Sequence, residues 1–156
     1  MENGNEVLRA IRERRSIRKF LPEHLKQRDL EAILEAGKWA ASAKGLQSAL
    51  MVVVDNPGDV ETLRKANAAI WGRPDIDPFY AAPDIVVVLA DGDTPNWLQD
   101  GSLVMGNLML AAYAVGAGSC WIRTCRKTND SAFHLDSALL WALQATERED
   151  YLFASP

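Results

Sequence analysis

The sequence predicts a three-layer α-β-α fold of the α/β or α+β class, with a long helix through its centre. Two short apolar runs, 49–54 and 85–90, do not alternate with polar residues, which is typical of strands covered on both faces. A third stretch, 103–122, has 20 residues without a charge. Because Gly116 and Gly118 lie near its end, it indicates a fully buried helix followed by a short strand, and not a membrane span.

The other elements follow from helical spacing of apolar residues and from residues that begin or end helices. Asn5 is a good N-cap for the first helix, and Pro22 breaks the chain before the second. In chain order, we expect helices at about 5–14, 26–39, 59–69, 100–115 and 131–145, strands at 49–54, 85–90 and through Trp121, and irregular segments at 40–48 and 74–83.

Composition limits the class of protein. The 156 residues carry a net charge of −4, and we expect them to form one domain, residues 1–156. Two cysteines are too few for a disulfide scaffold, and the N-terminus lacks an apolar leader, so the cytoplasm is the expected location. Six of the 17 basic residues lie within 9–19, in an otherwise acidic chain. This distribution argues against a nucleic-acid-binding surface and suits a small anion.

The basic cluster contains the sharpest motif, Arg14-Arg15-Ser16-Ile17-Arg18. In an extended segment, Arg14, Ser16 and Arg18 would point to one side, where their donors could converge on a phosphate. The alternatives are a solvated helix end or a kinase substrate site, and the motif by itself does not choose among them.

Two further segments have the small residues that let a backbone approach a ligand. In the loop 40–48, Ser42 and Gln47 could hydrogen-bond to the heteroatoms of a flat ring. In the segment 116–120, backbone N–H groups could face a ligand where the central helix meets its strand. The alternatives are an ordinary helix-to-strand loop and a glycine C-cap.

Metal and nucleophile chemistry receive little support. Cys120 and Cys125, with His24 and His134, lack the spacing of a zinc site. Cys120 has the character of a core thiol, although a cysteine–histidine nucleophile pair stays open. The hydrolase and metalloprotease motifs GxSxG and HExxH do not occur.

Together these segments resemble the nitroreductase family of FMN-dependent oxidoreductases. Residues 14–20 look like its RRSxRxF segment, 40–48 like its APSxxNxQPW loop, and 82–88 like its second strand. Residues 100–122 resemble its long central helix and following strand. The resemblance covers about residues 6–122, in the family's order.

The resemblance implies a homodimer of α+β nitroreductase-like subunits with a mixed sheet and two interfacial FMN sites. It also implies ping-pong hydride transfer from NADH or NADPH to a nitroaromatic, quinone or similar small acceptor, with no membrane or nucleic-acid partner. No catalytic side chain is required, because the flavin carries the chemistry. The cofactor-binding residues implied are Arg14, Arg15, Ser16, Arg18, Ser42, Ala43, Gly45, Gln47, Gly118 and Ser119.

The sequence departs from the family at two places. Ala41, Gly45 and Ser48 stand where the family loop has proline, asparagine and proline. The chain also ends at Pro156, with Leu152-Phe153-Ala154 the one hint of a further strand. These departures motivate a second hypothesis, a flavin-binding relative without turnover. A third hypothesis, a nucleic-acid-binding module, has only the basic cluster in its favour.

Overall fold

The computed structural model describes residues 5–122 and the strand at 138–145, for which it gives the backbone. The helices in these ranges are α1 (Glu6–Glu13), α2 (Gln27–Lys38), α3 (Pro57–Trp71) and α4 (Trp97–Ala114), with a 3₁₀ turn at Ala43–Gly45. The strands are β1 (Leu50–Val54), β2 (Asp84–Leu89), β3 (Ala117–Ile122) and β4 (Ala138–Ala145).

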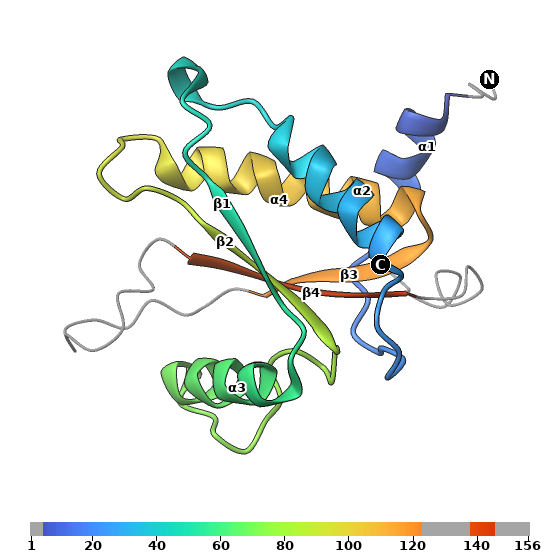
Figure 1. Ribbon diagram of the computed structural model, residues 1–156, viewed down its shortest axis with the longest axis vertical. Coiled ribbons are helices and arrows are strands. Elements are labelled where there is room, and N and C mark those ends of the chain that lie inside the picture. Colours follow the sequence, from blue (N-terminus) through green and yellow to red (C-terminus); the bar gives the residue numbers. More distant parts are fainter. Residues whose placement is uncertain (1–4, 123–137, 146–156) are drawn as a thin grey trace.

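The strands form one sheet in the order β1-β2-β4-β3, and α-helices lie on both of its faces. Figure 1 shows α2 and α4 on one side of the sheet and α3 on the other, so the three-layer prediction is confirmed. The three strand pairs are antiparallel. The parallel component expected of a mixed sheet is, in the described residues, the single bridge between Ser16 and Ser119.

Strand β2 shows why an apolar run without alternation becomes a central strand. Val86 and Val88 pack into the core beneath α2 and α4. Ile85 and Val87 point the other way, into a second core with Phe79. All four are buried, because each face of the strand has its own apolar layer.

Strand β1 is not covered on both faces by the described residues, so for this strand the same prediction is wrong. It lies at the edge of the sheet and pairs with β2 alone. Leu50 is 65% exposed and Val52 is 43% exposed. The side chains of an edge strand are buried only where another element covers them, and the described residues leave the Leu50 and Val52 side open.

Helix α4 is also less buried than the sequence suggests. Val104, Met105 and Leu108 are in the core, but Leu98 and Leu103 are 47% and 49% exposed. An uncharged helix therefore has one apolar side that the described part of this chain does not cover. No helix in the described ranges is both long and apolar enough to cross a membrane.

The largest correction concerns the helix expected at 131–145. Residues 138–145 form strand β4, which fills the middle of the sheet between β2 and β3. Its alanine, leucine and glutamine residues are good helix formers, but pairing along both edges overrides that local preference. Residues 131–137 and the strand hinted at by 152–154 lie outside the described residues.

Helix ends follow the expected chemistry. The Asn5 side chain accepts hydrogen bonds from the N–H groups of Val7 and Leu8, at 3.0 and 3.1 Å, which confirms it as the N-cap of α1. Helix α3 begins with Pro57, and Gly72 ends it with a left-handed φ of 73°. It is longer at both ends than the predicted 59–69.

Candidate functional site

The N-terminal basic segment lies against strand β3. Ser16 forms a parallel bridge with Ser119, and the Ile17 N–H donates to the Ser119 carbonyl at 2.9 Å. The Ile17 side chain is 6% exposed and acts as an anchor. Two candidate residues that are 103 positions apart in sequence, Ser16 and Ser119, are therefore neighbours in space.

The environment of Cys120 shows where the donors of the basic segment gather. Burial raises the pKa of the Cys120 thiol. The charge of Arg18, a hydrogen bond from Ser16 and the charge of Arg14 act in the opposite direction on that pKa. Arg14, Ser16 and Arg18 thus lie near enough to the buried Cys120 thiol to affect its pKa.

Arg14 and Arg15 differ sharply in what they contact. The Arg15 guanidinium donates to the carbonyls of Arg12 and Arg14, at 2.7 and 2.9 Å, and so satisfies the end of α1. Arg14 is partly buried, and its Nη1 is fully buried with no partner among the described residues. Leaving a buried donor of a charged group without a partner costs free energy. An anion would therefore be stabilised more by Arg14 than by Arg15, whose guanidinium is already bonded.

The N-terminal segment is fixed to the body by α1. The Tyr113 hydroxyl of α4 donates to Glu13 Oε2 at 2.6 Å, and Arg9 Nε donates to the same oxygen at 3.1 Å. These bonds lower the pKa of the Glu13 carboxyl, with the Tyr113 bond the larger cause. The last turn of α1, directly before Arg14, is therefore held against the central helix.

The loop 42–47 has a conformation that its sequence alone would not favour. Lys44, Gly45 and Gln47 have left-handed φ values of 56°, 65° and 49°. For the two residues other than glycine, this costs about 1–2 kcal/mol each. Gly45 replaces the family's asparagine at a position where both residue types are tolerated, so the backbone is kept while an amide side chain is lost.

Side-chain hydrogen bonds hold this loop in place. Ser42 Oγ accepts from the Gln47 N–H at 2.9 Å, and Gln47 Nε2 donates to the Ala40 carbonyl at 3.1 Å. The Ala43 N–H donates to Oδ1 of Asp100, in the first turn of α4, at 2.9 Å. Ser42 and Gln47 therefore shape the loop, and their contact with a ligand stays a prediction.

The structure brings some of the candidate residues together and keeps others apart. Arg14, Ser16, Arg18 and Ser119 form one group beside Cys120 of β3. The loop follows the other end of α2, and Figure 1 shows it well away from the N-terminal segment. Twelve residues of helix give a separation of about 18 Å along α2. Within one chain, these candidate residues form two separate groups.

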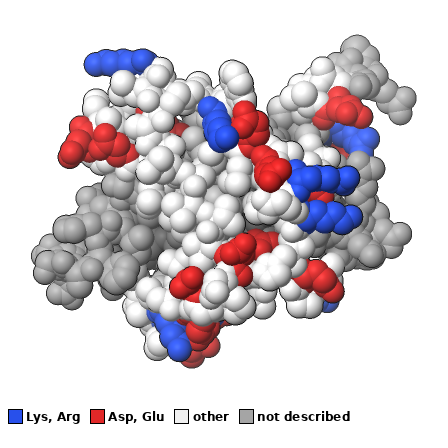
Figure 2. All heavy atoms as spheres, viewed as in Figure 1, with Lys and Arg blue, Asp and Glu red and all other residues white. Residues whose placement is uncertain are grey.

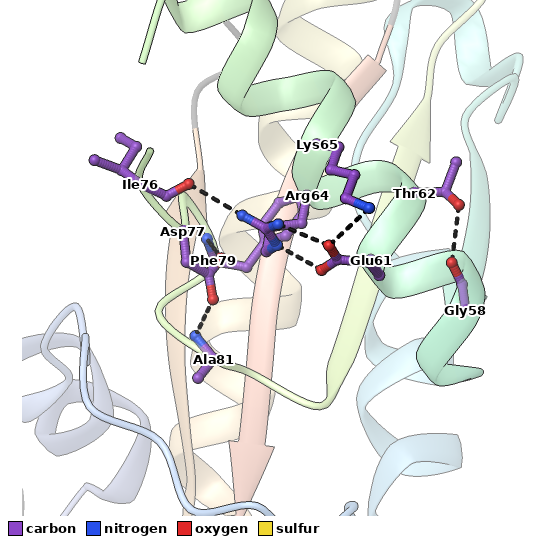
Figure 3. A network of polar contacts seen from close by, with 9 residues as sticks. All are labelled: Gly58, Glu61, Thr62, Arg64, Lys65, Ile76, Asp77, Phe79 and Ala81. Atoms are coloured by element: carbon purple, nitrogen blue, oxygen red, sulfur yellow. Dashed lines mark hydrogen bonds and ion pairs between the residues drawn. The ribbon is translucent and has the colours of Figure 1, made fainter. Parts of the chain in front are cut away.

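A cavity of about 310 Å³ lies elsewhere, beside α3, and none of the candidate residues lines it. At its wall, Arg64 donates to both oxygens of Glu61 and to the Ile76 carbonyl, and Asp77 accepts from the N–H groups of Phe79 and Ala81 (Figure 3). The Arg64 bond lowers the pKa of Glu61 to about 2. This network braces α3 against the segment that leads into β2.

His24 also lines that cavity, and its Nδ1 lies 2.7 Å from Oδ1 of Asp84. Asp84 is 2% exposed and accepts from the Leu25 N–H through its other oxygen, at 2.8 Å. The hydrogen bond to Asp84 raises the pKa of His24. The pair ties the segment after the basic cluster to the start of β2.

Sequence reasoning missed Asp100 and the position of Cys120. The sequence gives no sign that Asp100, at the expected start of the central helix, contacts the loop, or that Cys120 lies beside the basic segment. One signal for Asp100 was available: it is the charge that directly precedes the long uncharged stretch. Its contact with the loop, 57 residues earlier in the chain, could not be read from local pattern.

Charges on the face seen in Figure 2 are mixed. Acidic and basic side chains are interspersed there around a broad uncharged area, and the described residues on this face form no wide positive surface.

Comparison with known proteins identifies the family. The model of the nitroreductase family matches residues 11–82, the range that holds the N-terminal segment and the loop. A protein of Archaeoglobus fulgidus, named as a candidate NADH dehydrogenase/NAD(P)H nitroreductase, is 34% identical over 122 residues, which are 75% of this chain and 67% of the relative. The chain belongs to the nitroreductase family.

Other similar proteins support the same family. A similarly named protein of Methanothermobacter thermautotrophicus is 30% identical over 124 residues, 74% of this chain. The match spans 60% of the length of that relative. A Bacteroides fragilis nitroreductase with bound FMN has a TM-score of 0.82 at 25% identity, over 97% of this chain and 94% of its own. A Desulfitobacterium hafniense nitroreductase with bound FMN shares the fold, with a TM-score of 0.74 at 21% identity, over 91% and 89% of the two chains.

Proposed function

We propose that the protein is an FMN-dependent oxidoreductase that uses NADH or NADPH to reduce a nitroaromatic, quinone or similar acceptor. Membership of the nitroreductase family supports this proposal, as does the FMN bound by the Bacteroides fragilis relative. The chemistry that bound FMN supplies is hydride transfer from the nicotinamide to the acceptor in two alternating half-reactions.

The observation that carries the proposal is Arg14 Nη1, which is buried and has no partner among the described residues, in the segment that also holds Ser16 and Arg18. A phosphate dianion offers the acceptor oxygens that this donor lacks. Arginine presents a planar fork, and serine adds a compact hydroxyl, so the set fits the FMN phosphate better than it fits a solvated helix end. Arg15 has a smaller part, since its guanidinium is bonded at the end of α1.

The other candidate residues would contact the rest of the cofactor. Gly118 and Ser119 continue β3 beside the phosphate residues, and both are buried. The loop with Ser42, Ala43, Gly45 and Gln47 would meet the isoalloxazine ring mainly through its backbone. No side-chain acid is assigned, because the redox step belongs to the cofactor.

A second copy of the chain would join the two groups of candidate residues into one site. The separation of the loop from the N-terminal segment supports a site shared between protomers. So do the exposed apolar side chains of Val7, Leu8 and Ile11 on α1 and Leu103 on α4. Such side chains are expected where a partner covers them. In this arrangement, the loop of one protomer would contact the isoalloxazine ring of an FMN whose phosphate is held by the N-terminal segment of the other.

Flavin content and flavin reduction test the proposal. The purified protein, with and without added FMN, should hold about one FMN per chain, and anaerobic NADH or NADPH should bleach the oxidised flavin band. A protein that takes up no FMN would contradict the proposal. Bound FMN that stays oxidised with both nucleotides would favour the alternative, a flavin-binding relative without turnover.

A further inference from the structure

Asp100 has an unusual environment for a carboxylate. It is 4% exposed, yet it lies in the first turn of α4 and not in an ion pair within the described residues. Oδ1 accepts from the Ala43 N–H at 2.9 Å, whereas Oδ2 is buried and has no partner among those residues. A buried carboxylate oxygen without a donor is strongly disfavoured unless something else supplies one.

The hydrogen bond from Ala43 to Oδ1 attaches the 42–47 loop to helix α4. The other side-chain bonds of the loop join residues within 40–47, so they shape it without attaching it. In the described residues, the bond from Ala43 to Asp100 is the hydrogen bond that attaches it to a distant element. A loop with left-handed Lys44 and Gln47 persists only when its surroundings hold it.

The two oxygens of Asp100 therefore differ: Oδ1 accepts from Ala43, and Oδ2 has no partner among the described residues. Oδ1 and Oδ2 share one carbon atom, so the unpaired oxygen lies at the base of the loop, directly beside the Ala43 contact. Negative charge there is favoured by the N-terminus of α4. The described residues supply no N–H donor to Oδ2. A completed flavin site offers two sources of one: the imide N–H of the isoalloxazine ring and an N–H group of the partner protomer.

We propose that Asp100 is the positioning residue of the 42–47 loop, holding Ala43 through Oδ1 and accepting through Oδ2 an N–H donor that arrives when the flavin site is completed. This inference rests on the proposed function, because it assigns Asp100 to the same site. Its first part, the hold of Oδ1 on Ala43, can be tested separately from that function, because it concerns the protein without cofactor.

Two variants separate the two oxygens. Asp100→Asn keeps an acceptor for the Ala43 N–H and replaces the second acceptor by an NH₂ donor. Asp100→Ala removes both acceptors. Asp93→Asn is the matched control, because Asp93 is an exposed carboxylate in the loop before α4. Thermal unfolding of each protein checks that it is folded before the other measurements.

Hydrogen exchange of the cofactor-free protein tests the Oδ1 half. The Ala43 amide should exchange roughly tenfold faster or more in Asp100→Ala than in wild type, because a hydrogen bond to a charged group is lost. In Asp100→Asn and Asp93→Asn its exchange should change by less than about threefold. Equal exchange in Asp100→Ala and wild type would overturn the positioning role. This readout holds whether or not the protein binds FMN.

FMN titration and dimer dissociation test the Oδ2 half. Asp100→Asn should weaken one of these two equilibria by roughly tenfold or more, whereas Asp93→Asn should leave both unchanged. Weaker FMN binding with an unchanged dimer assigns the donor to the flavin, and a weaker dimer in the absence of FMN assigns it to the partner protomer. If Asp100→Asn matches wild type in both, Oδ2 accepts no such donor. If wild type itself takes up no FMN, the proposed function fails, and the exchange data still decide the role of Oδ1.

Discussion

Replacing Arg14 and Arg18, which lie two positions before and after Ser16, should release FMN while leaving the fold intact. In Arg14→Ala, Arg18→Ala, two charge-assisted hydrogen bonds to the phosphate are lost, each worth about 1.5–3 kcal/mol. Arg18 is exposed, so we count it at about 1 kcal/mol. Arg14 is partly buried and has a buried nitrogen, so we count it at about 2–3 kcal/mol. The sum predicts FMN binding weaker by roughly 100- to 1,000-fold.

The structure also predicts the effect on stability. Arg14 Nη1 has no partner in the described part of the chain, so its loss breaks no hydrogen bond there. The free energy of unfolding of the cofactor-free protein should therefore fall by no more than about 0.5 kcal/mol. Thermal and denaturant unfolding measure this change.

The control is Arg12→Ala, Lys19→Ala. It also removes two of the 17 basic residues and so takes the net charge from −4 to −6. Both residues are exposed and lie outside the candidate set. Its FMN affinity should fall by less than about threefold, which covers the loss of long-range attraction alone.

Titration with FMN and with riboflavin isolates the phosphate. Riboflavin lacks that group, so the Arg14→Ala, Arg18→Ala protein should bind riboflavin as wild type does, and the preference for FMN over riboflavin should collapse. The assignment of Arg14 and Arg18 is refuted if the double variant keeps that preference. It is also refuted if the control variant loses the preference to the same extent.

Three further results are expected. The hydrogen bond to Asp84 raises the pKa of His24 from its ordinary 6.5. The protonated His24 therefore stabilises the protein below about pH 6.5, and this contribution is lost as the pH rises through the pKa of His24 in the folded protein. Between about pH 6 and 9, the melting temperature of wild type should fall more than that of His24→Gln. In Gly37→Ala, the new Cβ would lie 2.5 Å from Met51 Sδ and 2.9 Å from Leu108 Cδ2. Denaturant unfolding should therefore show a free energy of unfolding lower by about 1–2 kcal/mol. Light scattering should give the mass of a dimer, and a monomer at all concentrations would argue against the shared site.

Local chemistry made much of the fold predictable. Asn5 as an N-cap and the doubly buried β2 follow from side chains that act within a few residues of their own position. Strand β4 was predicted as a helix because its residues favour one, and its pairing with β2 and β3 depends on segments more than 15 positions away. The exposure of β1 likewise depends on its place at the edge of the sheet, which its own residues do not specify.

The candidate site divides in the same way. The period of two of an extended segment predicts Arg14, Ser16 and Arg18 on one side. It could not show that Arg15 turns back onto α1, because that contact depends on where the helix ends. Asp100 was missed because its partner Ala43 comes from another part of the chain, and the resemblance carried no motif for such a pair.

Anaerobic reduction of the FMN-loaded protein tests the central claim most directly. The account predicts that NADH or NADPH bleaches the oxidised flavin band, and that a quinone or nitroaromatic added afterwards restores it in stoichiometric amount. The Arg14→Ala, Arg18→Ala protein, at the same concentrations of protein and FMN, should hold little flavin to bleach. A flavin that stays oxidised with both nucleotides in the wild-type protein would contradict the account.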